Sequence, residues 1–211
     1  MKDPYEKAAR AAYENCLALL DESKILAEHS KFARAYALCV LASEEFCKSF
    51  LYKGVSTGLA TEVDIRNALA RHSEKITRFV HLIIVPYLLS SHIEEIKKVR
   101  EHDKSEPDHE KHLYPTLMEE ILGETSKRTE VASLFFNAQE LKMKSLYVDM
   151  KGQTLIVPTE TIGQKEFDRI FGFLNAGLRG FEVILNEDDN DFRKMAEWFD
   201  PEFRYILKTR N

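Results

Sequence analysis

Apolar and polar residues follow the 3.6-residue period of an α-helix along most of the chain. Asp3-Pro4, followed two residues later by a glutamate, is typical of a helix start, and the apolar face behind it predicts a first helix to about residue 28. Ser30 is expected to cap a second helix over about 31–53, which Gly54 should end. Because only a tight turn separates the two helices, they should pack antiparallel.

Further helical patterns occupy most of the remaining chain. The segment 61–64 predicts the start of a third helix, and Pro86 must kink or end that helix because it lacks an amide donor. The other helices are expected over about 90–102, 115–144, 163–186, 191–199 and after Pro201.

The strand signal is confined to one short stretch. Leu146–Asp149 and Thr154–Val157 flank Lys151-Gly152, which predicts a β-hairpin. A lone hairpin is marginally stable, so we expect it to lie on the helices. The predicted fold is therefore an all-α, up-down bundle of four to five long helices with one small hairpin and covering C-terminal helices, in a single domain over 1–211.

Composition fits this fold and narrows the class of protein. Charged residues make up 31% and hydrophobic residues 44% of the 211-residue chain, which is typical of a globular protein. No apolar run approaches a membrane span, and the N-terminus lacks a signal-peptide core, so we expect a cytoplasmic protein. Cys16, Cys39 and Cys47 are expected to be buried free thiols. The net charge of −5 means that binding to nucleic acid would need a local basic patch.

The second helix has apolar residues on more than one side. Glu44, Glu45 and Lys48 lie opposite its aromatic face, but Leu38 and Leu41 share their arc. A solvated face does not usually carry such residues, so this face should also pack and partly bury its charges. Buried charges need partners.

His72 and Lys75, one turn apart on the next helix, are the expected partners. The predicted polar cluster contains Glu44, Glu45, Lys48, His72 and Lys75. The alternative is an ordinary surface pair of Glu44 with Lys48, which would contribute little to stability.

Three segments resemble a known family. Phe32–Leu38 leading into Ala42–Lys48 is similar to a small-residue helix that ends in an Ala-x-Glu-Glu-x-x-Lys-like pattern. His72–Lys75 is similar to a His-x-x-Lys-like step, and Leu146–Asp149 followed by Val157-Pro158 is similar to a Tyr-Val-Asp hairpin that ends in proline. In their order and spacing these segments resemble the AbiV family of abortive-infection proteins, a branch of the HEPN-like helical bundles.

The resemblance covers residues 32–158, with one departure at Cys47, where a small residue such as glycine is usual. It implies a phage-defence protein that responds to or binds a phage or host component and shuts down growth, with RNA as a candidate target. The alternative is a non-catalytic helical protein–protein interaction module, whose charged cluster only fixes helix register.

The resemblance also implies a candidate catalytic pair. HEPN-like nucleases carry an Arg-x(4–6)-His motif that cleaves RNA without metal, and Arg66 and His72 match it with five residues between them. An imidazole can move the proton of a 2′-hydroxyl, and a guanidinium can stabilise developing phosphate charge. Six steps along a regular helix, however, separate two side chains by about 120°. The alternative is a structural His72 bonded to a carboxylate.

Basic residues near this motif form a candidate phosphate-binding stripe. Its members are Asn67, Arg71, Lys75 and Arg78, at the spacing of one helix face. The alternative is a solvated face. No metal and no cofactor are expected, because the one Glu-x-x-His pattern, at 106–109, is interrupted by Pro107 and a di-iron bundle needs two such motifs.

HEPN-like proteins commonly pair through bundle helices, so the resemblance implies a homodimer. Aromatic residues are dense after residue 163. One helix face there should pack on the bundle; its members are Phe167, Phe171, Leu174, Leu178 and Phe181. Phe173 lies off that face, and Trp198-Phe199 lies near the chain end, so we interpret these as interface candidates. The alternative is that these rings pack on their own bundle.

Overall fold

The computed structural model describes residues 3–69 and 138–185, together with residues 92, 94, 95, 98, 99 and 102. The predictions for 70–137, where a few isolated residues are described, and for the chain after 185 lie outside the described residues. The elements are α1 (Pro4–Glu28), α2 (Phe32–Ser56), α3 (Glu62–Leu69), α8 (Ala138–Leu146), β1 (Asp149–Lys151), β2 (Thr154–Ile156), α9 (Pro158–Thr161) and α10 (Gln164–Leu185).

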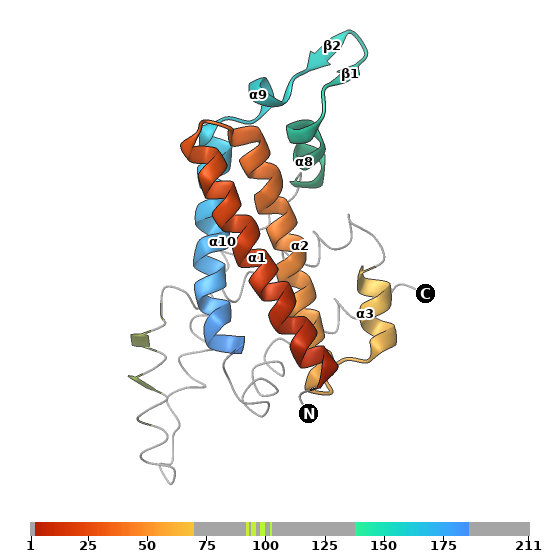
Figure 1. The fold of residues 1–211 in the computed structure, drawn as a ribbon, viewed down its shortest axis with the longest axis vertical. Helices are drawn as coiled ribbons and strands as arrows, with labels where there is room; N and C mark the ends of the chain where they lie inside the picture. Colours follow the sequence, from red (N-terminus) through yellow and green to blue (C-terminus); the bar gives the residue numbers. More distant parts are fainter. Residues whose placement is uncertain are drawn as a thin grey trace.

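The described fold is a helical bundle built around an antiparallel pair, α1 and α2 (Figure 1). The helix α10 packs along this pair, and α8 packs on α2 near the turn that joins α1 to α2. The helix α3 lies at the opposite end. The prediction of an all-α bundle with one small hairpin is confirmed. Within 3–69 and 138–185, no helix is long and apolar enough to cross a membrane.

The start of α1 follows from its sequence. The Asp3 carboxylate accepts a hydrogen bond from the Tyr5 amide at 2.8 Å, and Pro4 occupies the first helical position. This cap satisfies one of the amides that a helix start leaves without an intrahelical partner. The predicted helix start at Asp3-Pro4 is confirmed.

The turn between α1 and α2 differs from the prediction. Ser30 has a φ of 57°, in the left-handed region, and its amide donates to the Ala27 carbonyl at 2.8 Å. Lys31 is the N-cap of α2 and provides no side-chain hydrogen bond. Ser30 therefore closes the end of α1 and does not cap α2, because so short a connection, of three residues, needs a left-handed residue to reverse the chain.

The end of α2 also differs from the prediction. Gly54 is buried inside the helix, which continues to Ser56. Thr57 is the C-cap, and its hydroxyl donates to the carbonyls of Lys53 at 3.0 Å and Gly54 at 3.1 Å. Gly54 therefore does not end α2, because the side chain of Thr57 satisfies carbonyls that are left open at the helix end.

The core is centred on α2, which is buried on several sides. Phe46 and Leu51 of α2 are completely buried. From α10, Phe167 and Leu174 pack into the same core, and the ring of Phe167 lies 6.3 Å from that of Phe32. Phe173 is also buried, at 5% exposure, so it belongs to the core of its own chain and is not an interface residue.

The hairpin is shorter and more exposed than predicted. The helix α8 continues to Leu146, so the strand begins only at Asp149, and Met150 pairs with Leu155. Gly152 has a φ of 65° at the first turn position, which a type II′ hairpin requires. The expectation that the hairpin lies on the helices is wrong for the described helices. The strands are exposed and extend past the end of the bundle (Figure 1), because α8 ends there and the chain continues outward.

We expect Leu51→Ala to destabilise the protein by about 2–5 kcal/mol, because it leaves a cavity at a fully buried position. The matched control is Leu17→Ala on α1, where the side chain is 40% exposed and the expected loss is about 0.5 kcal/mol. Urea unfolding followed by circular dichroism measures both. Equal losses for the two variants would contradict the central position of α2.

Candidate functional site

An ion pair is buried between α2 and α8. The Nζ of Lys142 donates to Oε1 of Glu44 at 2.7 Å, and the two side chains are 7% and 4% exposed. The pair joins segments 98 positions apart in the sequence. It therefore fixes where α8 sits along α2.

Lys142 was not predicted as a partner of Glu44. It lies on the side of α8 that carries Ala138 and Ser145, both almost fully buried, and these small residues allow α8 to approach α2 closely. One sequence signal could have identified Lys142. It lies four residues after Ala138, on a helix face that also carries other small residues.

The energetic role of this pair follows from its burial. Removing two charges from water is costly, and their attraction repays that cost only when the geometry is good. A single charge left behind would be much less stable than either the pair or two neutral side chains. Glu44 is therefore a positioning residue for α8, and an ordinary surface pair of Glu44 with Lys48 is excluded.

The other predicted cluster residues are only partly described. Glu45 forms an ion pair with Lys48 one turn along α2, with side chains 18% and 28% exposed. His72 and Lys75 lie outside the described residues. The structure thus brings Glu45 and Lys48 together and pairs Glu44 with Lys142. That His72 and Lys75 belong to the cluster stays a prediction.

A second ion pair links α1 to α2. Lys53, 4% exposed, contacts Oε2 of Glu6 at 3.0 Å, and Glu6 also accepts a hydrogen bond from Arg10 at 3.2 Å. Close by, the hydroxyl of Ser49 donates to the carbonyl of Ala9 at 2.8 Å. The sequence pattern suggested a capping role for Glu6, so this contact between helices was missed.

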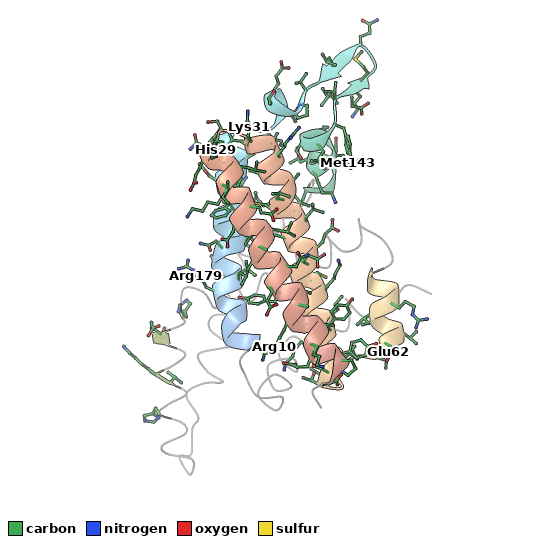
Figure 2. All side chains as sticks on the ribbon, in the orientation of Figure 1. Arg10, His29, Lys31, Glu62, Met143 and Arg179 are labelled. Atoms are coloured by element: carbon green, nitrogen blue, oxygen red, sulfur yellow. The ribbon has the colours of Figure 1, made fainter. Side chains whose placement is uncertain are left out.

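Arg66 lies on the exposed surface of α3, near the start of α1. Tyr5 is beside it: burial and a hydrogen bond to Glu62 raise the pKa of Tyr5, and the positive charge of Arg66 opposes that rise. The rings of Tyr5 and Tyr52 are 6.1 Å apart. Figure 2 shows Glu62 and Arg10 at this same end of the bundle. Arg66 is exposed, so solvent reaches its guanidinium.

The remaining site residues are not placed. His72, Arg71, Lys75 and Arg78 lie outside the described residues, and the side chain of Asn67 on α3 is not described. The candidate catalytic pair and the phosphate-binding stripe therefore stay predictions.

The described part of the chain offers little for a metal site or for a reactive cysteine. Among residues 3–69 and 138–185, no group of three His, Cys, Asp or Glu side chains is arranged to hold a metal ion. Cys16, Cys39 and Cys47 are buried thiols outside any disulfide, as predicted. Burial raises the pKa of Cys39 to about 12, so its thiol stays protonated at neutral pH and is a poor nucleophile.

One comparison with known proteins gave a match. The family model HEPN_AbiV, described as AbiV, matches residues 4–178, most of the chain. The match includes every described helix except the last turns of α10. No curated protein and no solved structure gave a significant match.

We expect Glu44→Gln to destabilise the protein by about 3–5 kcal/mol, because the buried Lys142 ammonium loses its charged partner. The double variant E44Q/K142M removes both charges and should recover part of that loss. Urea unfolding of the two variants and the wild type measures the difference.

The control is Glu140→Gln, which removes the solvent-exposed ion pair with Lys144 on the same helix. Its unfolding midpoint should stay close to that of the wild type. A double variant as unstable as Glu44→Gln alone would show that charge pairing does not stabilise the contact between α2 and α8.

Proposed function

Because the chain belongs to the AbiV family, we propose that it is a HEPN-like phage-defence protein that causes abortive infection by binding or cleaving RNA. The exposed guanidinium of Arg66, on α3 near Tyr5, is the observation that supports RNA as the target. A guanidinium recognises phosphate through charge-assisted, bidentate hydrogen bonds.

Arg66 and His72 are the proposed catalytic residues. In this proposal His72 takes the proton from the 2′-hydroxyl, whose oxygen attacks the adjacent phosphorus, and Arg66 stabilises the negative charge that develops on the phosphate. The bond from phosphorus to the 5′-oxygen breaks, which leaves a 2′,3′-cyclic phosphate, and the leaving 5′-oxygen takes up a proton from the imidazolium of His72 or from water. Both steps need only side chains of this chain, so the proposed cleavage is metal-independent. Arg66 is exposed on α3, which supports contact between its side chain and a strand of RNA.

We propose that the phosphate-binding stripe contacts RNA beyond the reacting phosphate. Asn67, Arg71, Lys75 and Arg78 would bind neighbouring phosphates, and their local positive charge would offset the chain's net charge of −5. Each phosphate contact makes binding more sensitive to salt, so this part of the proposal predicts affinity that falls as ionic strength rises.

The second candidate function is a non-catalytic interaction module, and one observation favours it. Glu44, at the centre of the predicted polar cluster, is 3% exposed and paired with Lys142. A residue in that position fixes helix register and does not contact a substrate. This alternative assigns the charged residues of α2 to structure alone and makes a phage or host protein the target.

The proposal also covers location and assembly. We place the protein in the cytoplasm, where phage transcripts are translated, and propose that it works as a homodimer and responds to a phage or host component.

We expect the purified protein to cleave single-stranded RNA in the presence of EDTA. Arg66→Ala and His72→Ala should each lower the rate by about a hundredfold or more, because each removes one of the two catalytic groups. Arg169→Ala is the matched control, an exposed arginine on α10 outside the motif, and should keep the wild-type rate. Gel analysis of end-labelled RNA measures these rates.

Plating efficiency of phage on bacteria that express each variant separates the two functions. Protection that is lost together with cleavage supports the ribonuclease. Protection that Arg66→Ala and His72→Ala both retain would contradict it and favour the interaction module.

Light scattering at micromolar concentration should give twice the 24.4 kDa chain mass, as a homodimer requires. A mass of one chain that does not change with concentration would contradict the homodimer and leave the ribonuclease proposal to its own test.

A further inference from the structure

The start of α3 is held against the bundle by the connection to α2 and by its own apolar side. The Gly54 carbonyl accepts hydrogen bonds from the amides of Leu59 at 2.8 Å and Ala60 at 3.1 Å, which fixes the connection between the two helices. Ile65 is 4% exposed and packs in the core. These contacts set where α3 begins and which side of it faces the bundle.

Glu62 lies on α3 between the buried side and Arg66. At about 100° per residue, Glu62 is about 60° from Ile65 around the helix axis, and Arg66 is about 100° from Ile65 in the same direction. Glu62 and Arg66 are also one turn apart, so their side chains are neighbours on the surface of α3. A contact of Glu62 with the bundle is therefore made at the edge of α3 from which Arg66 projects.

Tyr5 of α1 makes this contact. Its hydroxyl donates a hydrogen bond to the Glu62 carboxylate, and Arg66 is close enough for its positive charge to act on that hydroxyl. Burial and the bond to Glu62 raise the pKa of Tyr5, so the hydroxyl keeps its proton at neutral pH and remains a donor. Figure 2 shows Glu62 of α3 close to the start of α1.

The backbone and the ring of Tyr5 are both held in place. Its amide donates to the Asp3 carboxylate at 2.8 Å in the cap of α1, where Pro4 occupies the first helical position. Its ring lies 6.1 Å from that of Tyr52 on α2, and both rings are half-buried against the core. The Tyr5 hydroxyl is thus held at a defined point, and a fixed donor orients the group that it binds.

We propose that Tyr5 is a positioning residue for Arg66, because its hydrogen bond to Glu62 fixes the edge of α3 from which the guanidinium reaches the RNA phosphate. This inference rests on the ribonuclease proposed above and adds a residue that acts through Arg66. A guanidinium stabilises developing charge most when it is already oriented, since turning during the reaction costs part of that stabilisation. Loss of the hydrogen bond should therefore lower kcat more than it raises KM.

The first experiment removes only the hydroxyl. Tyr5→Phe keeps the ring beside Tyr52 and should lower kcat for RNA cleavage about tenfold, with KM within about twofold of the wild type. Tyr147→Phe is the matched control, because it removes the hydroxyl of an exposed tyrosine beyond α8 and should keep the wild-type kcat. Circular dichroism and urea unfolding check that both variants are folded. An unchanged kcat in Tyr5→Phe would overturn the inference.

The second experiment separates the hydrogen bond from the charge of Glu62. Glu62→Gln keeps an acceptor for the Tyr5 hydroxyl, whereas Glu62→Leu has none, and neither variant carries the charge. Glu62→Leu should therefore cleave RNA about tenfold more slowly than Glu62→Gln. The double variant Y5F/E62L should be no slower than Glu62→Leu alone, because both changes remove the same bond. Equal rates for Glu62→Gln and Glu62→Leu would show that this bond does not act on cleavage.

The third experiment determines whether Tyr5 acts through Arg66. In the Arg66→Ala background, Tyr5→Phe should cause no further loss of rate, because the group that Tyr5 positions is absent. A further loss of about tenfold would give Tyr5 a role of its own, in the fold or in contact with RNA, and would overturn the positioning.

An NMR measurement without RNA keeps the inference separate from the proposed ribonuclease. The side-chain Nε–H signal of Arg66, assigned by its loss in Arg66→Ala, should shift in Tyr5→Phe and in Glu62→Leu but not in Tyr147→Phe. A signal that shifts in a protein that does not cleave RNA supports the positioning and contradicts the ribonuclease. A signal that stays in place in Tyr5→Phe overturns the positioning, whether or not RNA is cleaved.

Discussion

The burial of α2 is the constraint on which the rest of the described structure depends. A helix covered on several sides cannot direct all of its charged side chains to water, and desolvated charges require partners. Lys53 forms an ion pair with Glu6 on α1, and Glu44 forms one with Lys142 on α8. The positions of α1 and α8 along α2 are therefore set by ion pairs as well as by apolar packing. Apolar packing alone would let one helix shift along another.

This constraint also divides the charged residues by role. Those enclosed between helices act on the fold, whereas Arg66 is accessible at one end of the bundle and the hairpin extends from the other. The rigid pair of α1 and α2 separates these two ends. Substitutions at the end that carries Arg66 can therefore test the proposed RNA chemistry without altering the core between the two ends.

The periodic pattern of the sequence predicted much of the fold, for physical reasons. The limits of α1 and α2 and the start of α10 agree with the structure to within a few residues, because each has a long apolar face and α1 begins with a strong cap. The predictions were wrong where one residue type suits two different structural roles. Ser30 could cap one helix or close another, and tertiary packing selected the left-handed turn.

The candidate site was less predictable, because pairing between distant side chains leaves little trace in a single sequence. The mixed face of α2 indicated that Glu44 needed a partner, but periodicity does not say which of several lysines would supply it. Lys142 became the partner because Ala138 and Ser145 let its helix come close. The position of the hairpin depended on where α8 ends, and the three-residue strands carry no signal for that.

The buried pair of Glu44 and Lys142 has a consequence for the order in which the chain matures on the ribosome. The antiparallel contact of α1 with α2 forms between neighbouring segments and is complete once the first 56 residues have emerged. Lys142 is synthesised 98 residues after Glu44, about 5–20 s later at ordinary translation rates. During that interval Glu44 is without Lys142, and the side of α2 that α8 will cover is open. Glu44 is hydrated on that open side, so the contact with α8 can form only together with the charge of Lys142.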